Sequence, residues 1–252
     1  MTVPAPYAPL VRMARWGSEM QLVAATDVVQ GALLAAEYPI AFVAIEPDED
    51  DIGPFLLLES ILASDETFAR VSAEDLKMTL WRLGASDLET LEGLARKYRR
   101  NPKKLAQLYH RVAANNIRYS QNGTQGYGIW PIVSRSNHSC DPNAKLGANA
   151  TQPLAELLLA TRPIPNGAAI CWNYFADESF LGLKWFERNA QLLKDFQFLC
   201  RCPRCEAERP PEVAGLSKEG LAAFFRHRGG PGISQPGPFN ALRSAKLPAV
   251  NG

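Results

Sequence analysis

The chain lacks the features that mark membrane-spanning, secreted and strongly charged proteins. No apolar run reaches the roughly 18–20 residues that a membrane-spanning helix needs. The opening residues hold no basic segment leading into an apolar one, so we expect no secretory signal. Lys and Arg total 27 against 26 Asp and Glu, a net charge of +1 that argues against direct nucleic-acid binding. We therefore expect a soluble intracellular protein without a membrane partner, in the cytoplasm, the nucleus or both.

Cysteine is scarce and unevenly placed. Of five cysteines in 252 residues, Cys200, Cys202 and Cys205 lie within six positions, whereas Cys140 and Cys171 stand far upstream. An odd number of cysteines without a secretory signal argues against a disulfide framework. The spacing Cys-x-Cys-x-x-Cys favours a bound metal, with free or redox-active thiols as the alternative.

A structural zinc ion takes four ligands, so the three clustered cysteines need a fourth from elsewhere in the chain. The residues alone rank Cys140 first and Cys171 second. His138 and His227 are less favoured candidates. The sequence therefore predicts a zinc site that joins the cysteine cluster to a distant segment.

Periodicity divides the chain into β-rich and helical parts. Residues 10–46 and 117–182 contain short apolar or alternating runs that are typical of strands. Residues 54–115 instead carry leucines at helical spacing. We therefore predict a mainly β fold with an α insertion, in the α+β class.

Capping patterns predict where helices of the insertion begin. One helix is expected from Ser72 to Gly84, where leucines follow at helical spacing. A second is expected from Ser86, since Glu89 completes a capping-box pattern. Asn101 followed by proline predicts the start of a third.

The C-terminal third changes character twice. Residues 183–208 combine an amphipathic helix, expected over 184–196, with the cysteine cluster. Residues 209–252 are rich in proline and glycine, which predicts a flexible tail with a short helix at 217–227. The chain shows no internal repeat.

Two further segments combine polar and aromatic residues in unusual patterns. Asn137-His138-Ser139-Cys140 follows an apolar stretch and precedes a turn. A Cys–His nucleophile pair is disfavoured there, because residues so close in sequence rarely present both side chains to one substrate atom. Gly167 to Tyr174 forms a turn, a short apolar strand and a tyrosine at the strand end. Taken alone, each segment is compatible with a structural role.

Together, these two segments and Cys200-x-Cys202-x-x-Cys205 resemble the SET family of lysine methyltransferases, in particular its SET-and-MYND (SMYD) branch. The resemblance covers roughly residues 10–206. It implies a SET domain over 10–182, built of short β-sheets with a helical insertion. A post-SET helix and zinc cluster would follow over 183–208. Five cysteines are too few to build a MYND finger beside this site.

The resemblance also implies roles for individual residues. Asn137 and His138 would hold S-adenosylmethionine, and Tyr174 would be the catalytic tyrosine at the end of a narrow lysine channel. Phe196 and Phe198 would form an aromatic channel wall and a ring against adenine. The implied ligands of a structural Zn²⁺ ion are Cys140, Cys200, Cys202 and Cys205.

The implied reaction transfers a methyl group from S-adenosylmethionine to the side-chain amine of a protein lysine. A lysine with a pKa of about 10.4 is mostly protonated at neutral pH and must first lose its proton. A poorly hydrated aromatic channel lowers that pKa by desolvation. The expected partner is a histone or non-histone protein with an accessible lysine; a monomer is compatible with the sequence, which leaves the oligomeric state open.

The sequence departs from the family pattern at three places. Glu19 and Gln21 occupy positions of an N-terminal glycine-rich element, near Gly17. Gly167 is followed by two alanines instead of two glutamates, and Phe196 replaces a common tyrosine. The first two changes favour an alternative, a catalytically weak or inactive SET-fold interaction scaffold, whereas the lost hydroxyl at Phe196 bears on how many methyl groups are added. A zinc-dependent nucleic-acid binder is a third reading, which the balanced charge disfavours.

Overall fold

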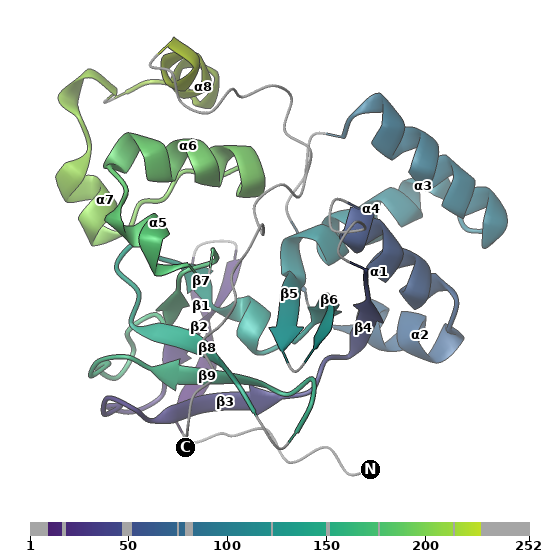
Figure 1. Ribbon diagram of the computed structural model, residues 1–252, viewed down its shortest axis with the longest axis horizontal. Helices are drawn as coiled ribbons and strands as arrows, with labels where there is room; N and C mark the ends of the chain where they lie inside the picture. The colour runs from purple at the N-terminus through teal and green to yellow at the C-terminus, as the bar shows by residue number, and fades with distance from the viewer. Residues whose placement is uncertain are drawn as a thin grey trace.

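Small β-sheets form the body of the protein, and the helices lie in two separate groups on different sides of these sheets (Figure 1). The computed structural model describes residues 10–16, 19–46, 52–74, 76–78, 83–121, 123–149, 152–175, 177–213 and 215–227. Helices α1 to α4 lie on the right of Figure 1, and α5 to α8 lie at its upper left. This arrangement confirms the predicted α+β class with a helical insertion.

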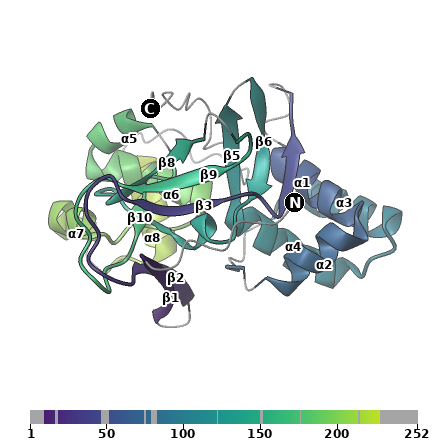
Figure 2. The same cartoon turned by 90° about the horizontal axis from the view of Figure 1, so that it is seen from below.

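The described strands form two pairs and two three-stranded sheets. The three-stranded sheets have the orders β3-β9-β8 and β4-β6-β5, both antiparallel, whereas β7 and β10 pair in parallel. The antiparallel hairpin of β1 and β2 projects at the lower edge of Figure 2. In chain order the strands are β1 (Val11–Trp16), β2 (Glu19–Ala24), β3 (Leu33–Glu37), β4 (Ala41–Ala44), β5 (Asn116–Gln121), β6 (Thr124–Ile129), β7 (Asn137–His138), β8 (Ala144–Ala148), β9 (Glu156–Ala160) and β10 (Cys171–Trp172).

The helices fall into the insertion and the C-terminal group. None of them, within the described residues, is long and apolar enough to cross a lipid bilayer. The α-helices are α1 (Gly53–Leu62), α2 (Asp65–Ala73), α3 (Ala85–Lys97), α4 (Pro102–Asn115), α5 (Glu178–Gly182), α6 (Trp185–Phe196), α7 (Pro203–Glu208) and α8 (Lys218–His227). Short 3-10 turns lie at Val133–Arg135 and Pro211–Val213.

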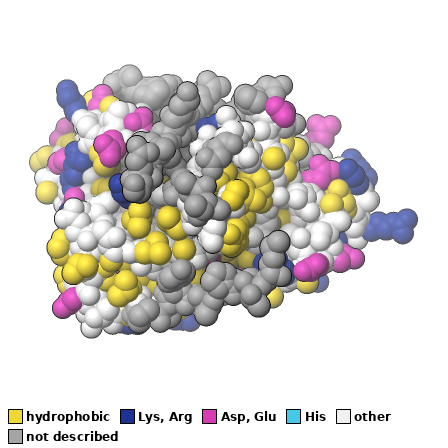
Figure 3. Space-filling model, turned by 60° about the horizontal axis from the view of Figure 1, so that its bottom comes forward, with side chains coloured by type: hydrophobic (Ala, Val, Ile, Leu, Met, Phe, Trp, Pro, Cys, Tyr) yellow, Lys and Arg dark blue, Asp and Glu magenta, His cyan; other side chains and the backbone are white. Residues whose placement is uncertain are grey.

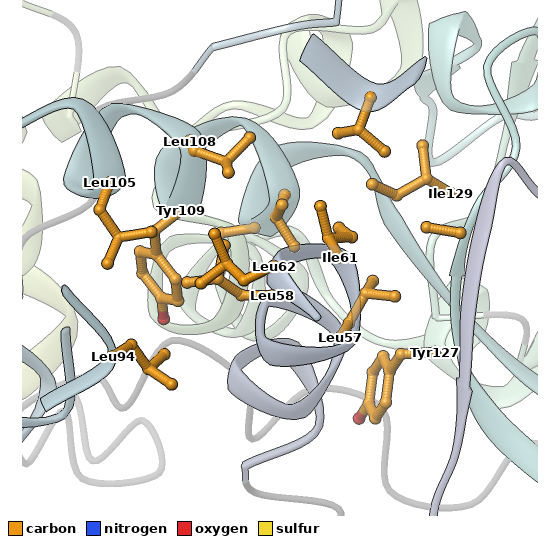
Figure 4. Close-up of a cluster of buried hydrophobic side chains, with 14 of the residues drawn as sticks. Leu57, Leu58, Ile61, Leu62, Leu94, Leu105, Leu108, Tyr109, Tyr127 and Ile129 are labelled. Atoms are coloured by element: carbon orange, nitrogen blue, oxygen red, sulfur yellow. The ribbon is translucent and has the colours of Figure 1, made fainter. Parts of the chain in front are cut away.

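The insertion has its own apolar core, which joins the helices to the sheet of β4, β5 and β6. Leu57, Leu58 and Ile61 of α1 are fully buried, with Leu58 on the side of Tyr109 of α4 and Leu57 beside Tyr127 of β6 (Figure 4). Tyr127 of β6 closes the cluster on the sheet side. It packs so closely on α1 that a Cβ atom at Gly53 would lie 2.0 Å from its ring. The insertion is therefore fixed to the sheet.

Two of the predicted helix starts were wrong. The described residues around Leu76 are not helical, because α2 begins earlier, where Ser64 Oγ accepts a hydrogen bond from Thr67 N at 3.2 Å. α3 begins at Ala85, because the Asp87 carboxylate accepts from Gly84 N at 2.8 Å and so moves the cap two residues upstream of Ser86.

The third helix start is confirmed. Asn101 caps α4 as predicted, since its Oδ1 accepts from Lys104 N at 3.2 Å.

Two carboxylates lie opposite each other inside the sheet of β3, β9 and β8. Glu37 and Glu156 are cross-strand partners in the antiparallel register. Glu156 has no exposed surface, and among the described residues neither of its carboxylate oxygens has a hydrogen-bond partner. Glu37 Oε1 accepts from Val133 N at 2.6 Å. Burial raises the pKa of both groups, to about 8 for Glu156 and about 7 for Glu37.

The described residues continue beyond position 208, after which the Pro/Gly-rich tail was expected. The helix expected at 217–227 is present as α8, and it packs on α6 through Leu221 and Phe225. Both side chains are buried, and Phe225 lies 5.9 Å from Trp185 between ring centroids. Their spacing of four residues places them on one face of the helix. Residues 228–252 lie outside the described part of the chain.

The surface seen in Figure 3 carries no large area of one charge sign. Apolar side chains gather near the middle of this face, and Lys, Arg, Asp and Glu are spread around its edge. This distribution agrees with the net charge of +1.

Candidate active site and metal centre

The pairing of β7 with β10 brings the two polar segments together. Asn137 lies opposite Cys171 and His138 opposite Trp172 in parallel register. Asn143 reinforces the pairing, because its Oδ1 accepts from Cys171 N and its Nδ2 donates to Ala169 O, both at 2.8 Å. A two-residue pair is short, and these side-chain bonds extend it. Sequence reasoning had assigned no role to Asn143.

Tyr174 follows β10 and is fixed at both its backbone and its hydroxyl. The hydroxyl donates to Ser136 O at 3.0 Å, and the backbone N–H donates to His138 Nδ1 at 3.2 Å. Burial lowers the pKa of His138 to about 3, so the imidazole is neutral and can accept this bond. The loop of β7 therefore positions the tyrosine.

An aromatic wall surrounds Tyr174. The centroid of the Phe196 ring lies 5.2 Å from that of Tyr174, and the Phe198 centroid lies 6.3 Å from Tyr174 and 5.9 Å from His138. Phe196 ends α6, and Gln197 then adopts a left-handed conformation with φ +57°. This turn ends the helix and directs Phe198 to the same centre. The structure thus brings together the tyrosine, the histidine and both phenylalanines that the sequence singled out.

A lysine from the insertion reaches Asn137. Lys77 Nζ donates to Asn137 Oδ1 at 2.8 Å and to Ser136 O at 3.4 Å. The two residues are 60 positions apart in sequence, and sequence reasoning did not find the contact. No local pattern around Lys77 distinguishes it from other surface lysines.

The altered glycine element also touches the site. Asn137 Nδ2 donates to Gln21 Oε1 at 3.5 Å, so a side chain stands where the family pattern has none. Gly17 and the side chain of Glu19 lie outside the described residues. At the second departure, Gly167 has φ +80° and Ala24 N donates to Ala168 O at 2.9 Å. The backbone of this turn is therefore held without the two missing carboxylates.

Two buried polar atoms beside this centre have no hydrogen-bond partner within the described part of the chain. They are Ser136 Oγ and Trp172 Nε1, and the Trp172 ring lies 5.1 Å from that of Tyr174. Buried polar atoms are rarely left unsatisfied in folded proteins. Together with the acceptors on Ser136 and Asn137, they make a polar centre within an aromatic wall, which fits a ligand with an ammonium group and an aromatic base.

Four cysteines form a compact cluster. The Sγ atoms of Cys140, Cys200, Cys202 and Cys205 all lie within 4.8 Å of one another. Cys171 is not part of this group, and nothing is described of the His227 side chain. Four converging sulfurs are the donor set that zinc prefers, so the residues fit a structural Zn²⁺ ion.

Helix α6 places a positive charge and an amide against the sulfurs. Arg188 is fully buried, and its Nη2 donates to Cys205 Sγ at 3.7 Å and to Glu208 Oε2 at 2.6 Å. Asn189 Nδ2 also donates to Cys205 Sγ at 3.7 Å, while its Oδ1 accepts from Cys200 N at 2.9 Å. Four thiolates on a divalent ion carry a net charge of −2, and a buried guanidinium compensates part of it. This outer layer supports the metal assignment and was not predicted from the sequence.

Several curated lysine methyltransferases are similar to part of this chain. Histone-lysine N-methyltransferase ASHR2 of Arabidopsis thaliana is 28% identical over 97 residues, 37% of this chain and 23% of the relative. Protein-lysine N-methyltransferase SMYD4 of Homo sapiens is 33% identical over 88 residues, 35% of this chain and 10% of the relative. The SET domain and MYND-type zinc finger protein 6 of Schizosaccharomyces pombe is 29% identical over 137 residues, 53% of this chain and 27% of the relative. The chain thus spans about a tenth to a quarter of the length of these relatives.

Other comparisons add less. A solved structure of the SET domain of LSMT bound to lysine and AdoHcy aligns with a TM-score of 0.42 and 12% identity, over 67% of this chain and 50% of that chain. No protein-family model matches the chain. The sequence relatives nevertheless confirm the resemblance based on the two polar segments and the cysteine cluster. Over part of its length the chain is therefore similar to SET-domain protein-lysine methyltransferases, including members of the SMYD branch.

Proposed function

We propose that the chain is a protein-lysine N-methyltransferase that uses S-adenosylmethionine and carries a structural zinc ion. The observation that carries the proposal is the position of Tyr174. Its hydroxyl donates a hydrogen bond to Ser136 O, and its ring lies beside the rings of Phe196 and Phe198. Its substrate would be a protein with an accessible lysine, histone or non-histone. The named activities of the sequence relatives support the same assignment.

The hydrogen bonds of Tyr174 determine how it would treat an incoming amine. Its O–H donates to Ser136 O, so the hydroxyl oxygen can only accept from a further partner. An N–H of a substrate lysine would donate to that oxygen. The lone pair of the nitrogen would then remain free to attack. Tyr174 would thus orient the nucleophile, an effect that can supply several kcal/mol of the barrier reduction.

The aromatic wall would prepare the substrate lysine for reaction. Phe196, Phe198 and the neutral His138 place apolar rings around Tyr174 and offer no negative charge to a lysine ammonium, so a lysine bound among them would lose part of its hydration. Desolvation of this kind lowers the pKa of a lysine and favours the neutral amine. S-adenosylmethionine, when bound, would supply an activated methyl group on a sulfonium ion. Asn137 Oδ1 and Ser136 O would accept hydrogen bonds from its ammonium group.

A second candidate function is a catalytically weak or inactive SET-fold scaffold. The contact of Gln21 with Asn137 favours it, because a side chain occupies space that glycine would leave open beside the proposed cofactor site. The scaffold would keep the fold and the zinc ion but bind no cofactor.

Calorimetry with S-adenosylhomocysteine separates the two functions. The zinc-loaded wild-type chain is expected to bind it saturably, and an Asn137→Ala/His138→Ala double variant is expected to lose binding. Tyr174→Phe should retain binding while methyl transfer to a panel of lysine-containing proteins falls at least tenfold. Absence of binding by folded, zinc-loaded protein would overturn the enzyme assignment and leave the scaffold.

A further inference from the structure

Lys77 places an ammonium group in the centre of the proposed cofactor site. It lies between α2 and α3, in the described segment 76–78, and its side chain crosses from the insertion to the loop of β7. Its Nζ is 2.8 Å from Asn137 Oδ1 and 3.4 Å from Ser136 O. Hydrogen bonds from a charged donor are about twice as strong as neutral ones. These two acceptors therefore form an ammonium-binding pair that this chain fills with its own lysine.

The insertion holds Lys77 in this position by its backbone. Asn115, at the end of α4, has an exposed fraction of 1%. Its Oδ1 accepts from Lys77 N at 3.2 Å, and its Nδ2 donates to Lys77 O at 2.7 Å and to Arg111 O at 2.8 Å. The neighbouring Leu76 is buried in the insertion core. The lysine thus projects from an anchored segment.

The same acceptors are those that the proposed function assigns to the cofactor. The Ser136 carbonyl also accepts from the Tyr174 hydroxyl at 3.0 Å, so Lys77 lies next to the proposed catalytic group. S-adenosylmethionine carries an ammonium on its amino-acid end. Two ammonium groups on one amide oxygen repel each other and compete for the same lone pairs. The cofactor can therefore take these acceptors only after Lys77 has left them.

We propose that Lys77 is an intramolecular competitor for the ammonium of the cofactor, through which the insertion controls cofactor affinity; the inference rests on the proposed function. Binding would require the lysine side chain to rotate away, while Asn115 keeps its backbone in place. The apparent affinity for the cofactor equals the intrinsic affinity multiplied by the fraction of molecules in which Lys77 has left the two acceptors. If the contact is formed about nine-tenths of the time, the cofactor binds about tenfold more weakly. A partner that draws Lys77 away, such as an acidic segment on a substrate protein, would raise cofactor affinity.

The test compares two ligands on matched variants. Zinc-loaded wild type, Lys77→Met and the control Lys104→Met, an exposed lysine in α4, are titrated by calorimetry with S-adenosylhomocysteine. Each is also titrated with 5′-methylthioadenosine, which lacks the amino-acid end. Lys77→Met should bind S-adenosylhomocysteine about tenfold more tightly than the other two proteins. Affinity for 5′-methylthioadenosine should be equal in all three.

The outcomes separate this inference from the proposed function. Equal binding of S-adenosylhomocysteine by wild type and Lys77→Met overturns the competition but leaves the methyltransferase standing. Weaker binding by Lys77→Met also overturns it, because Lys77 would then contribute to the site. No binding by any folded variant contradicts the proposed function itself. Thermal unfolding of each variant establishes that it is folded.

Discussion

The buried carboxyl of Glu156 should make the protein lose stability as pH rises. It lies on β9 opposite Glu37 of β3, has no exposed surface, and has no hydrogen-bond partner in the part of the chain that the structure describes. Burial, and secondarily the charge of Glu37, raises its pKa from 4.5 to about 8 in the folded chain. The folded state therefore retains a proton that the unfolded state releases between those two values. Stability contributed by the neutral carboxyl is fully present below pH 4.5 and declines up to about pH 8.

The size of this effect follows from proton linkage. Each pH unit between the two pKa values lowers the free energy of unfolding by about 1.4 kcal/mol. The loss attributable to Glu156 is thus about 3 kcal/mol at pH 7 and at most about 5 kcal/mol above pH 8. Glu156→Gln removes the titration while retaining shape and polarity. We expect the stability of the variant relative to wild type to increase by about 3.5 kcal/mol between pH 5 and pH 8.

Urea unfolding followed by tryptophan fluorescence, at intervals from pH 5 to pH 9, measures the difference. Glu89→Gln is the matched control, because Glu89 is exposed on α3. The control should follow the wild-type curve throughout. If Glu156→Gln shows the same decline with pH as wild type, then Glu156 is ionised in the folded chain and the argument from burial fails.

Three further predictions concern the metal centre, the core and the aromatic wall. Arg188→Leu should speed zinc release to a chromogenic chelator about tenfold relative to the exposed control Arg201→Leu, because a buried counter-charge is lost; equal release rates would contradict this role. Gly126→Ala should destabilise the chain by more than about 2 kcal/mol in urea, since its Cβ would lie 2.2 Å from Val43 O. On α3, a Cβ atom added at Gly93 would meet no other atom within 4 Å, so Gly93→Ala should instead stabilise the chain by about 0.5–1 kcal/mol. If Gly126→Ala and Gly93→Ala changed the stability by similar amounts, the packing argument would be refuted. Phe198→Ala should weaken S-adenosylhomocysteine binding about tenfold by calorimetry, and unchanged affinity would remove this ring from the proposed site.

Short-range patterns in the sequence predicted much of this structure. The Asn101 cap and helix α8 follow from residues a few positions apart, and both are present. The compact cluster of the four cysteines is also present, although its fourth member is 60 residues from the others. It was predictable because zinc requires four ligands and the family resemblance named Cys140.

The missed features depend on long-range contacts or on competition between similar local signals. The start of α3 was misplaced because Ser86 and Asp87 are both good capping residues, and only the folded chain shows which one bonds the free N–H group. The contact of Lys77 with Asn137 depends on how the insertion packs against the loop of β7. The Glu37–Glu156 pair depends on strand register. Neither contact can be predicted from the sequence around its residues.

The cysteine cluster also has a consequence for how the chain folds. A metal bound by Cys140 and the group from Cys200 to Cys205 would close a loop of about 60 residues, as a disulfide does, but without needing an oxidising compartment. Closing a loop of that length removes roughly 4 kcal/mol of conformational entropy from the unfolded chain. The loop contains β8 to β10, Tyr174, α5 and the whole of α6. The complete metal site could therefore form only after Cys205 has been synthesised. Metal binding would then hold the segment that carries Tyr174 in place.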